Sequence, residues 1–154
     1  MIFSRSAEYA IRAFVYLVDV EEGRYAMAKN IAQECNTPMH FLAKILQQLA
    51  RKGFLRSKKG PAGGFALNRP ADDINLLELV DAIDGLSEHQ RCPGGMAECS
   101  DEAQCGMHDS WKELRERILH YLEDTSILDL NVAQKKKIAA LSKKKRPRKS
   151  TKKK

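Results

Sequence analysis

The chain has 154 residues and a formal net charge of +7; apolar residues make up 43% of it and charged residues 31%. This balance is that of a globular protein and excludes a collagen-like or wholly disordered chain. Charged side chains interrupt the first twenty residues, and no segment approaches the roughly 20 apolar residues of a membrane span. We therefore expect a cytoplasmic protein without a signal peptide or membrane contact, in which the cysteines stay reduced and act as ligands or sensors rather than disulfides.

Charge is segregated along the chain. Residues 1–70 contain 11 Lys/Arg and 5 Asp/Glu, residues 71–134 contain 4 and 15, and residues 135–154 contain 12 and none. A basic front half is typical of a module that contacts nucleic-acid phosphates, because neutralising phosphates releases condensed counterions. The alternative is a set of merely solvated basic surfaces.

Three helices are predicted in the front half. Apolar residues recur at helical spacing over residues 6–18, and a short second helix is expected over residues 26–35. Thr37 is a natural N-cap for a third helix, with Pro38 at its first position, and Gly53 ends that helix after Arg51. The predicted buried stripe of the third helix is Phe41, Leu42, Ile45, Leu46 and Leu49.

The opposite face of the third helix carries donors and cations with little bulk, as a helix entering the major groove requires. Residues 54–58 and 65–67 then predict two strands joined by the glycine-rich turn 59–64, which is the layout of a winged helix. Cations on this wing could reach phosphates, and its glycines let the backbone approach a groove. The predicted DNA-contacting residues are Thr37, His40, Lys44, Gln47, Arg51, Arg56, Lys58, Lys59, Gly60 and Gly63.

A long helix is predicted after a short one capped by Asn75 and a loop without periodicity. Over residues 108–124 the apolar side chains follow a heptad-like seam: Trp111, Leu114, Ile118, Tyr121 and Leu122. The seam could cover the chain's own core, but the front half has enough apolar faces to close on itself. We therefore expect a helix that forms a homodimer, which would match a pseudo-palindromic operator.

These predictions give a mainly α fold with a small β-wing in four segments. Residues 1–85 form a winged helix-turn-helix, 86–107 a cysteine-rich loop, 108–132 the dimerisation helix and its extension, and 133–154 a disordered Lys-rich tail. The tail could add salt-sensitive DNA affinity or serve solubility alone.

The loop contains Cys92, Cys99 and Cys105, followed by His108, in the pattern C-x6-C-x5-C-x2-H. Structural zinc normally uses a close cysteine pair, which this loop lacks, whereas iron–sulfur clusters accept thiolates at more varied spacing and a non-cysteine ligand. A cluster is favoured, and a zinc staple or three scattered thiols remain the alternatives. Cys35 is expected to be a small core residue.

The sequence resembles the winged-helix regulators of the IscR and NsrR types, the Rrf-two family, over about residues 1–132. Four features carry the resemblance: residues 4–13 at the start, residues 31–32 with 41–49 in the second and third helices, the wing at 58–67, and the three-cysteine loop followed by Trp111. The Lys-rich tail lies outside the family pattern.

The resemblance implies a homodimeric transcriptional regulator, a repressor in our interpretation, that reads double-stranded DNA with the third helix and wing. It also implies that Cys92, Cys99 and Cys105 ligate a [2Fe–2S] or [4Fe–4S] cluster that switches DNA affinity or site choice. The fourth ligand would be His108, as in the IscR type, or Glu8 from the partner subunit, as in the NsrR type. Family members without a cluster also lack this loop.

Two other function classes are weaker. A DNA-binding regulator whose loop holds structural zinc or no metal would answer to a different signal. An enzyme is not expected, because the sequence offers no nucleophile–base pairing, phosphate loop or Cys-x-x-Cys pair.

Overall fold

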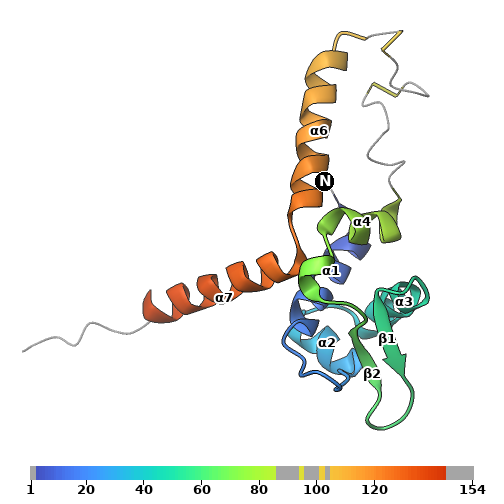
Figure 1. Cartoon of the computed structure of the whole chain (residues 1–154), viewed down its shortest axis with the longest axis vertical. Helices are drawn as coiled ribbons and strands as arrows, with labels where there is room; N and C mark the ends of the chain where they lie inside the picture. The colour runs from blue at the N-terminus through green and yellow to red at the C-terminus, as the bar shows by residue number, and fades with distance from the viewer. Residues whose placement is uncertain (1–2, 86–93, 96–100, 103–104, 145–154) are drawn as a thin grey trace, which may run out of the picture.

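The structure is a computed structural model of the chain that describes residues 3–85, 94–95, 101–102 and 105–144. The elements in order are α1 (Arg5–Leu17), α2 (Ala28–Glu34), α3 (Met39–Arg51), β1 (Leu55–Lys58), β2 (Gly64–Leu67), the 3-10 turn η1 (Ala71–Asp73), α4 (Leu76–Asp84), α6 (His108–Asp124) and α7 (Ile127–Lys144). The prediction of a mainly helical fold with a two-stranded wing is confirmed (Figure 1). Among the described residues, the helices include none with the length and apolar character of a membrane span.

Helix α1 lies at the centre of the core. Ser4 caps it by accepting a hydrogen bond from the Ala7 backbone N–H at 3.1 Å. The Ser4 backbone N–H and hydroxyl both donate to the Asp84 carboxylate, which ties the start of α1 to the end of α4. The buried face of α1 consists of Ala7, Ala10, Ala13, Phe14, Val15 and Leu17. Its small residues allow other helices to approach closely, so α1 organises the whole body.

The start of α3 differs from the prediction by one residue. Pro38 is the N-cap, since its carbonyl accepts from the Leu42 N–H at 3.0 Å, and α3 begins at Met39. Thr37 is therefore not the cap; its hydroxyl donates to the Cys35 carbonyl at 3.2 Å within the turn before the helix. The turn also contains Asn36 with φ of +49°, a conformation that asparagine tolerates.

The predicted buried stripe of α3 was wrong at one residue. Leu42, Ile45, Leu46 and Leu49 are buried, but Phe41 is 43% exposed. Its ring lies edge-on to Tyr9 of α1, with centroids 6.0 Å apart. Phe41 sits at the border of the stripe, where helical spacing alone does not separate buried from half-covered positions.

The wing is an antiparallel pair in which Leu55 lies opposite Leu67 and Lys58 opposite Gly64. Strand β2 also pairs with the segment before α2, because Ala26 and Phe65 exchange two backbone hydrogen bonds of 2.9 and 2.8 Å. This pairing explains why α2 begins at Ala28 rather than at the predicted residue 26. The wing is thus fixed at its root to the helical body.

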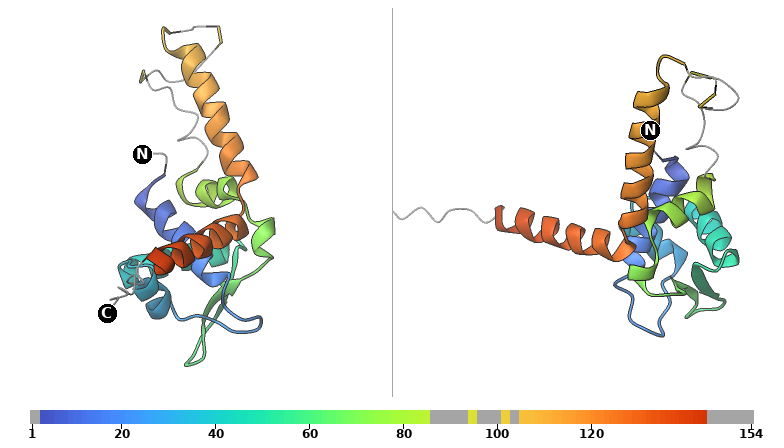
Figure 2. Two further views of the ribbon diagram at one scale, coloured as in Figure 1. Left: turned by 90° about the vertical axis from the view of Figure 1, so that its left-hand side faces the viewer. Right: turned by 45° about the horizontal axis from the view of Figure 1, so that its top comes forward.

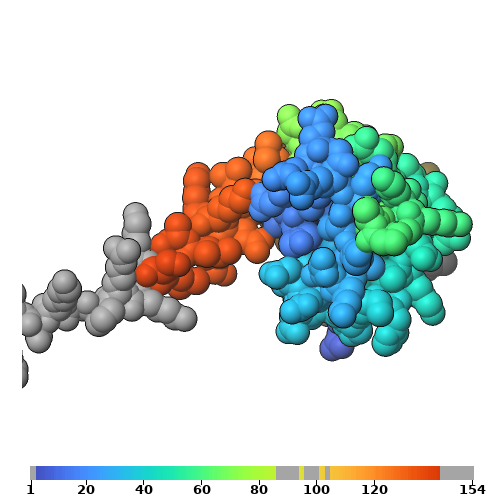
Figure 3. Space-filling model, turned by 90° about the horizontal axis from the view of Figure 1, so that it is seen from below, coloured from blue at the N-terminus to red at the C-terminus, as the bar shows by residue number. Residues whose placement is uncertain are grey.

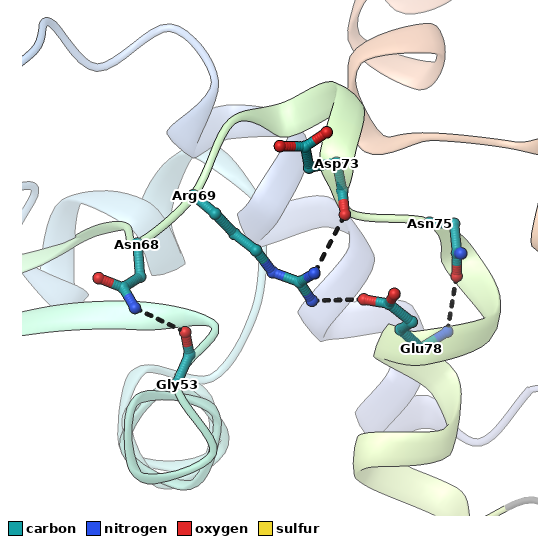
Figure 4. A network of polar contacts seen from close by, with 6 residues as sticks. All are labelled: Gly53, Asn68, Arg69, Asp73, Asn75 and Glu78. Carbon is teal, nitrogen blue, oxygen red and sulfur yellow. Dashed lines mark hydrogen bonds and ion pairs between the residues drawn. The ribbon is translucent and has the colours of Figure 1, made fainter.

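A polar network joins the wing to α4 (Figure 4). The Arg69 guanidinium donates to the Asp73 carbonyl at 3.1 Å, pairs with the Glu78 carboxylate, and lies 5.0 Å from the Phe54 ring centroid. Asn68 closes the base of the wing by donating to the Gly53 carbonyl at 2.9 Å. The chain leaving β2 is therefore held in one path towards α4.

Helices α6 and α7 leave the body in different directions (Figures 1 and 2). Leu122 and Ile127 are buried in the core on either side of the turn between the helices. Two backbone hydrogen bonds of 2.9 Å pair this turn with the segment before α4, from Leu76 N–H to Thr125 and from Ile127 N–H to Ile74. Seen from below, the far end of α7 projects from the body (Figure 3).

The expectation of disorder from residue 133 was wrong for residues 133–144, which continue α7; residues 145–154 lie outside the described residues. Ser126 and Asp129 cap the start of α7 reciprocally, with the Asp129 N–H donating to the Ser126 hydroxyl at 3.1 Å and the Ser126 N–H to the Asp129 carboxylate at 3.0 Å. Asn131 anchors α7 to α1 by donating to the Val15 carbonyl at 3.0 Å. These contacts fix the start of α7, and the lysines that follow are themselves good helix formers.

Candidate functional site

The outer face of α3 presents four of the predicted DNA-contacting side chains. They are all exposed, opposite the buried stripe: His40, Lys44, Gln47 and Arg51. Because the buried stripe locks the rotation of α3 on the body, these side chains have a fixed common direction. The face combines the permanent cations of Lys44 and Arg51 with the Gln47 amide, which can form hydrogen bonds with a base edge.

The end of α3 and the wing enclose a groove of about 680 Å³. Its walls are Gln47, Ala50, Arg51, Ser57, Lys58, Lys59, Gly64 and Phe65. The structure therefore brings Gln47 and Arg51 of α3 together with Lys58 and Lys59 of the wing on one concave surface. Lys58 is also held over the Tyr25 ring, 5.8 Å from its centroid.

Three predicted residues lie apart from this groove or have another role. Thr37 is only 8% exposed, and its hydroxyl is engaged with the Cys35 carbonyl. Arg56 donates to the Leu67 carbonyl at 3.3 Å and lines a separate hollow at the other side of the wing. Gly63 is buried in the hairpin, where an added Cβ would lie 2.2 Å from the Lys58 carbonyl oxygen. Gly63 thus closes the turn rather than offering an open backbone.

The cysteine loop is described in part. Cys105 carries an exposed thiol just before α6, while Cys92 and Cys99 lie outside the described residues. Across the described part of the chain, no group of three or more His, Cys, Asp or Glu side chains is gathered as for a metal. Glu8 lies in the first turn of α1, and its carboxylate is 4.0 Å from the Arg12 guanidinium.

His108 is held in place by a carboxylate. Its side chain is 5% exposed, and Nε2 lies 2.8 Å from an Asp101 carboxylate oxygen. Lys112 donates to the same carboxylate at 3.0 and 3.2 Å. The hydrogen bonds from His108 and Lys112 lower the pKa of Asp101. A carboxylate hydrogen-bonded to an imidazole is the usual support of a metal-binding histidine, since it fixes the orientation of the ring.

Two further side chains, Trp111 and Cys35, bear on the chemistry of the cysteines. The indole Nε1 of Trp111, one turn after His108, is buried without a hydrogen-bond acceptor in the described structure. Cys35 is half-buried in a groove between α1 and α7, and burial raises the pKa of its thiol. A thiol with a raised pKa is a poor ligand, which fits the expected packing role of Cys35.

A family model described as "Rrf2: Iron-dependent Transcriptional regulator" matches residues 3–133. The chain belongs to the Rrf2 (Rrf-two) family. A protein of Aquifex aeolicus named as an HTH-type transcriptional regulator is 33% identical over 138 residues, covering 88% of this chain and 95% of the relative. IscR of Xenorhabdus nematophila is 28% identical over 131 residues, covering 84% and 79%.

Solved structures share the fold. CymR, the global cysteine regulator of B. subtilis, matches with a TM-score of 0.71 at 21% identity, covering 85% of this chain and 96% of CymR. IscR of T. potens matches with a TM-score of 0.66 at 16% identity, covering 94% and 91%. The Rrf2 chain is thus a DNA-binding transcriptional regulator with a winged helix-turn-helix and not an enzyme, as the sequence predicted.

Two residues at the groove of α3 and the wing were not predicted from the sequence. They are Tyr25, which lies under Lys58, and Gly64, which lines the groove. The Gly63-Gly64 pair was a usable signal, because two adjacent glycines before a strand mark close backbone approach. Tyr25 had no such signal, since its place depends on the pairing of Ala26 with β2.

Proposed function

We propose that this Rrf2 protein is a cytoplasmic homodimeric repressor whose operator affinity or site choice is governed by an iron–sulfur cluster. The observation that carries the proposal is the shared groove of α3 and the wing, lined by Arg51, Lys58 and Lys59, on a chain that also carries the three-cysteine loop. In the proposed complex, α3 enters the major groove of the DNA. His40, Lys44 and Gln47 face the bases, and Arg51, Lys58 and Lys59 contact phosphates.

The dimer is supported by apolar side chains that α6 leaves uncovered. Leu114 and Tyr121, one heptad apart, are 49% and 57% exposed, whereas Ile118 and Leu122 turn towards the body. Pairing two α6 helices would cover this strip and would set the distance between the two α3 helices of the dimer. That distance must match the spacing of operator half-sites.

The residues of the loop fit a cluster in their chemistry. Cys92, Cys99 and Cys105 would hold it as thiolates, with His108 as fourth ligand on the support of Asp101. Glu8 of the partner subunit is the alternative fourth ligand. When bound, the cluster supplies a centre that responds to iron–sulfur status, redox state or nitric oxide, and its binding energy would order the loop against α6.

The test is metal content and DNA binding of anaerobically purified protein. Iron, sulfide and zinc are assayed with the visible spectrum, and the operator is obtained by selection from a random duplex library with the cluster-bound protein. We expect stoichiometric iron and sulfide in the wild type, their loss in Cys105→Ala, and their retention in Cys35→Ala, the matched control outside the loop. Lys44→Ala should lose DNA affinity and keep the cluster.

Three outcomes would contradict the proposal. Zinc instead of iron would mean that the loop is a structural metal site. No metal after reconstitution would mean that the regulator responds to another signal. Equal affinity and site choice for cluster-bound wild type and Cys105→Ala would remove the switching role, leaving a DNA-binding regulator.

A further inference from the structure

Trp111 is the one tryptophan of the chain, and it has a buried donor without an acceptor in the described structure. An indole N–H can only donate, so no rearrangement within the side chain satisfies it. Buried polar groups in folded proteins nearly always have a partner, and each exception calls for an explanation, such as a functional role or a bound group that accepts the hydrogen bond. The acceptor for Trp111 is therefore to be sought beyond the described residues.

The position of Trp111 limits what that acceptor is. Trp111 follows His108 by three residues on α6, so the two side chains are neighbours on one helix face. The helix is regular at this point, since the Trp111 backbone N–H donates to the Met107 carbonyl at 2.9 Å. Cys105 lies just before the same end of α6. The unpaired indole N–H thus belongs to the end of α6 that also carries Cys105 and His108, two of the residues that the proposed function assigns to the cluster.

We propose that the Trp111 indole donates a hydrogen bond to a sulfur atom of the cluster site, either an inorganic sulfide or a ligating thiolate. The inference rests on the proposed function. Donors to the sulfur atoms stabilise the reduced, more negative state of an iron–sulfur centre and raise its reduction potential. Trp111 is then a positioning residue that adjusts the potential at which the regulator responds.

The experiment compares Trp111→Phe with wild type, both loaded with cluster under anaerobic conditions. Tyr16→Phe, which removes a polar hydrogen from a partly buried aromatic ring of α1 outside the proposed DNA, dimer and cluster sites, is the matched control. Iron and sulfide content, reduction potential and the resonance Raman Fe–S bands in H₂O and D₂O are measured. We expect Trp111→Phe to keep its iron and sulfide, to have a lower potential and to lose part of the deuterium shift, while Tyr16→Phe behaves as wild type.

The outcomes separate the two proposals. An unchanged potential and deuterium shift in fully loaded Trp111→Phe overturns the hydrogen bond and leaves the cluster in place. Absence of iron and sulfide from the wild type overturns the proposed function, and this inference with it.

Wild type alone decides the matter if Trp111→Phe fails to assemble a cluster. Labelling with ¹⁵N in the indole ring gives a single N–H resonance from the one tryptophan. We expect slow hydrogen exchange in the cluster-bound protein and fast exchange after cluster removal. Equal exchange rates in both forms would refute the proposal.

Discussion

Replacing Gly64 with alanine should detach the wing from the helical body. Gly64 has φ of +141°, and a Cβ there would lie 2.1 Å from the carbonyl oxygen and 2.4 Å from the carbonyl carbon of Ala26. Both atoms belong to the backbone, so relief requires β2 to move away as a whole. That movement breaks the two hydrogen bonds between Ala26 and Phe65.

The size of the effect follows from these contacts. Two lost hydrogen bonds cost about 1 kcal/mol each, and the left-handed conformation costs an alanine about 1–3 kcal/mol. The free energy of unfolding should therefore fall by about 3–5 kcal/mol, which is a large share of the roughly 5–15 kcal/mol of a typical domain. For a chain of this size the melting midpoint should fall by roughly 6–20 °C.

The assay is urea and thermal unfolding followed by circular dichroism, with Gly60→Ala as the matched control. Gly60 also has a positive φ, +103°, but an added Cβ there meets no atom within 4 Å. Gly60→Ala carries the backbone strain without the collision. If Gly64→Ala were as stable as Gly60→Ala, close approach of β2 to Ala26 would not be the reason for the glycine.

Three further predictions concern the C-terminal helices. Leu114→Asp should convert the dimer into monomers in sedimentation experiments, because it places a charge in the uncovered strip of α6, and an unchanged dimer would refute the α6 interface. Asn131→Ala should lower the free energy of unfolding in urea by about 1–3 kcal/mol, because it leaves the Val15 carbonyl without its donor; a wild-type midpoint would contradict this. The hydrogen bond from Lys135 lowers the pKa of Asp19 in the folded state, so its stabilisation is complete above the ordinary carboxyl value of 3.8 and is lost as pH falls through the folded pKa. Asp19→Asn should flatten the acid side of the stability profile, whereas an equal slope would show that this pair does not contribute.

The front half of the fold could be predicted because its signals are local. The apolar spacing of α1 and α3 and the glycine-rich turn of the wing each predict one element without reference to distant residues. Phe41 was misplaced because its exposure depends on how Tyr9 of α1 lies beside it, which periodicity does not encode. The polar face of α3 could be predicted from its spacing, but the contact of Lys58 with the Tyr25 ring depends on the tertiary pairing of Ala26 with β2.

Helix α7 could have been predicted in part. Lysines dominate its composition. Ile127, Leu130, Asn131 and Ile138 nevertheless lie on the one side of the helix that faces α1. Ser126 and Asp129, three residues apart, are a capping signal at the start of that pattern. The Lys-rich composition predicted disorder in spite of both signals. The contact between Asn131 and Val15, which are 116 residues apart, has no local signal in the sequence.

Helix α6 is a long rod that is anchored at the turn to α7. It is fixed at one end by Leu122, Ile127 and the two backbone hydrogen bonds to the segment before α4. Its 17 residues extend for about 25 Å to the end that carries His108, at about 1.5 Å per residue. A tilt of about 10° at this turn would displace the far end by about 4 Å, so a displacement of that size at the far end would reach α4 only as a small rotation.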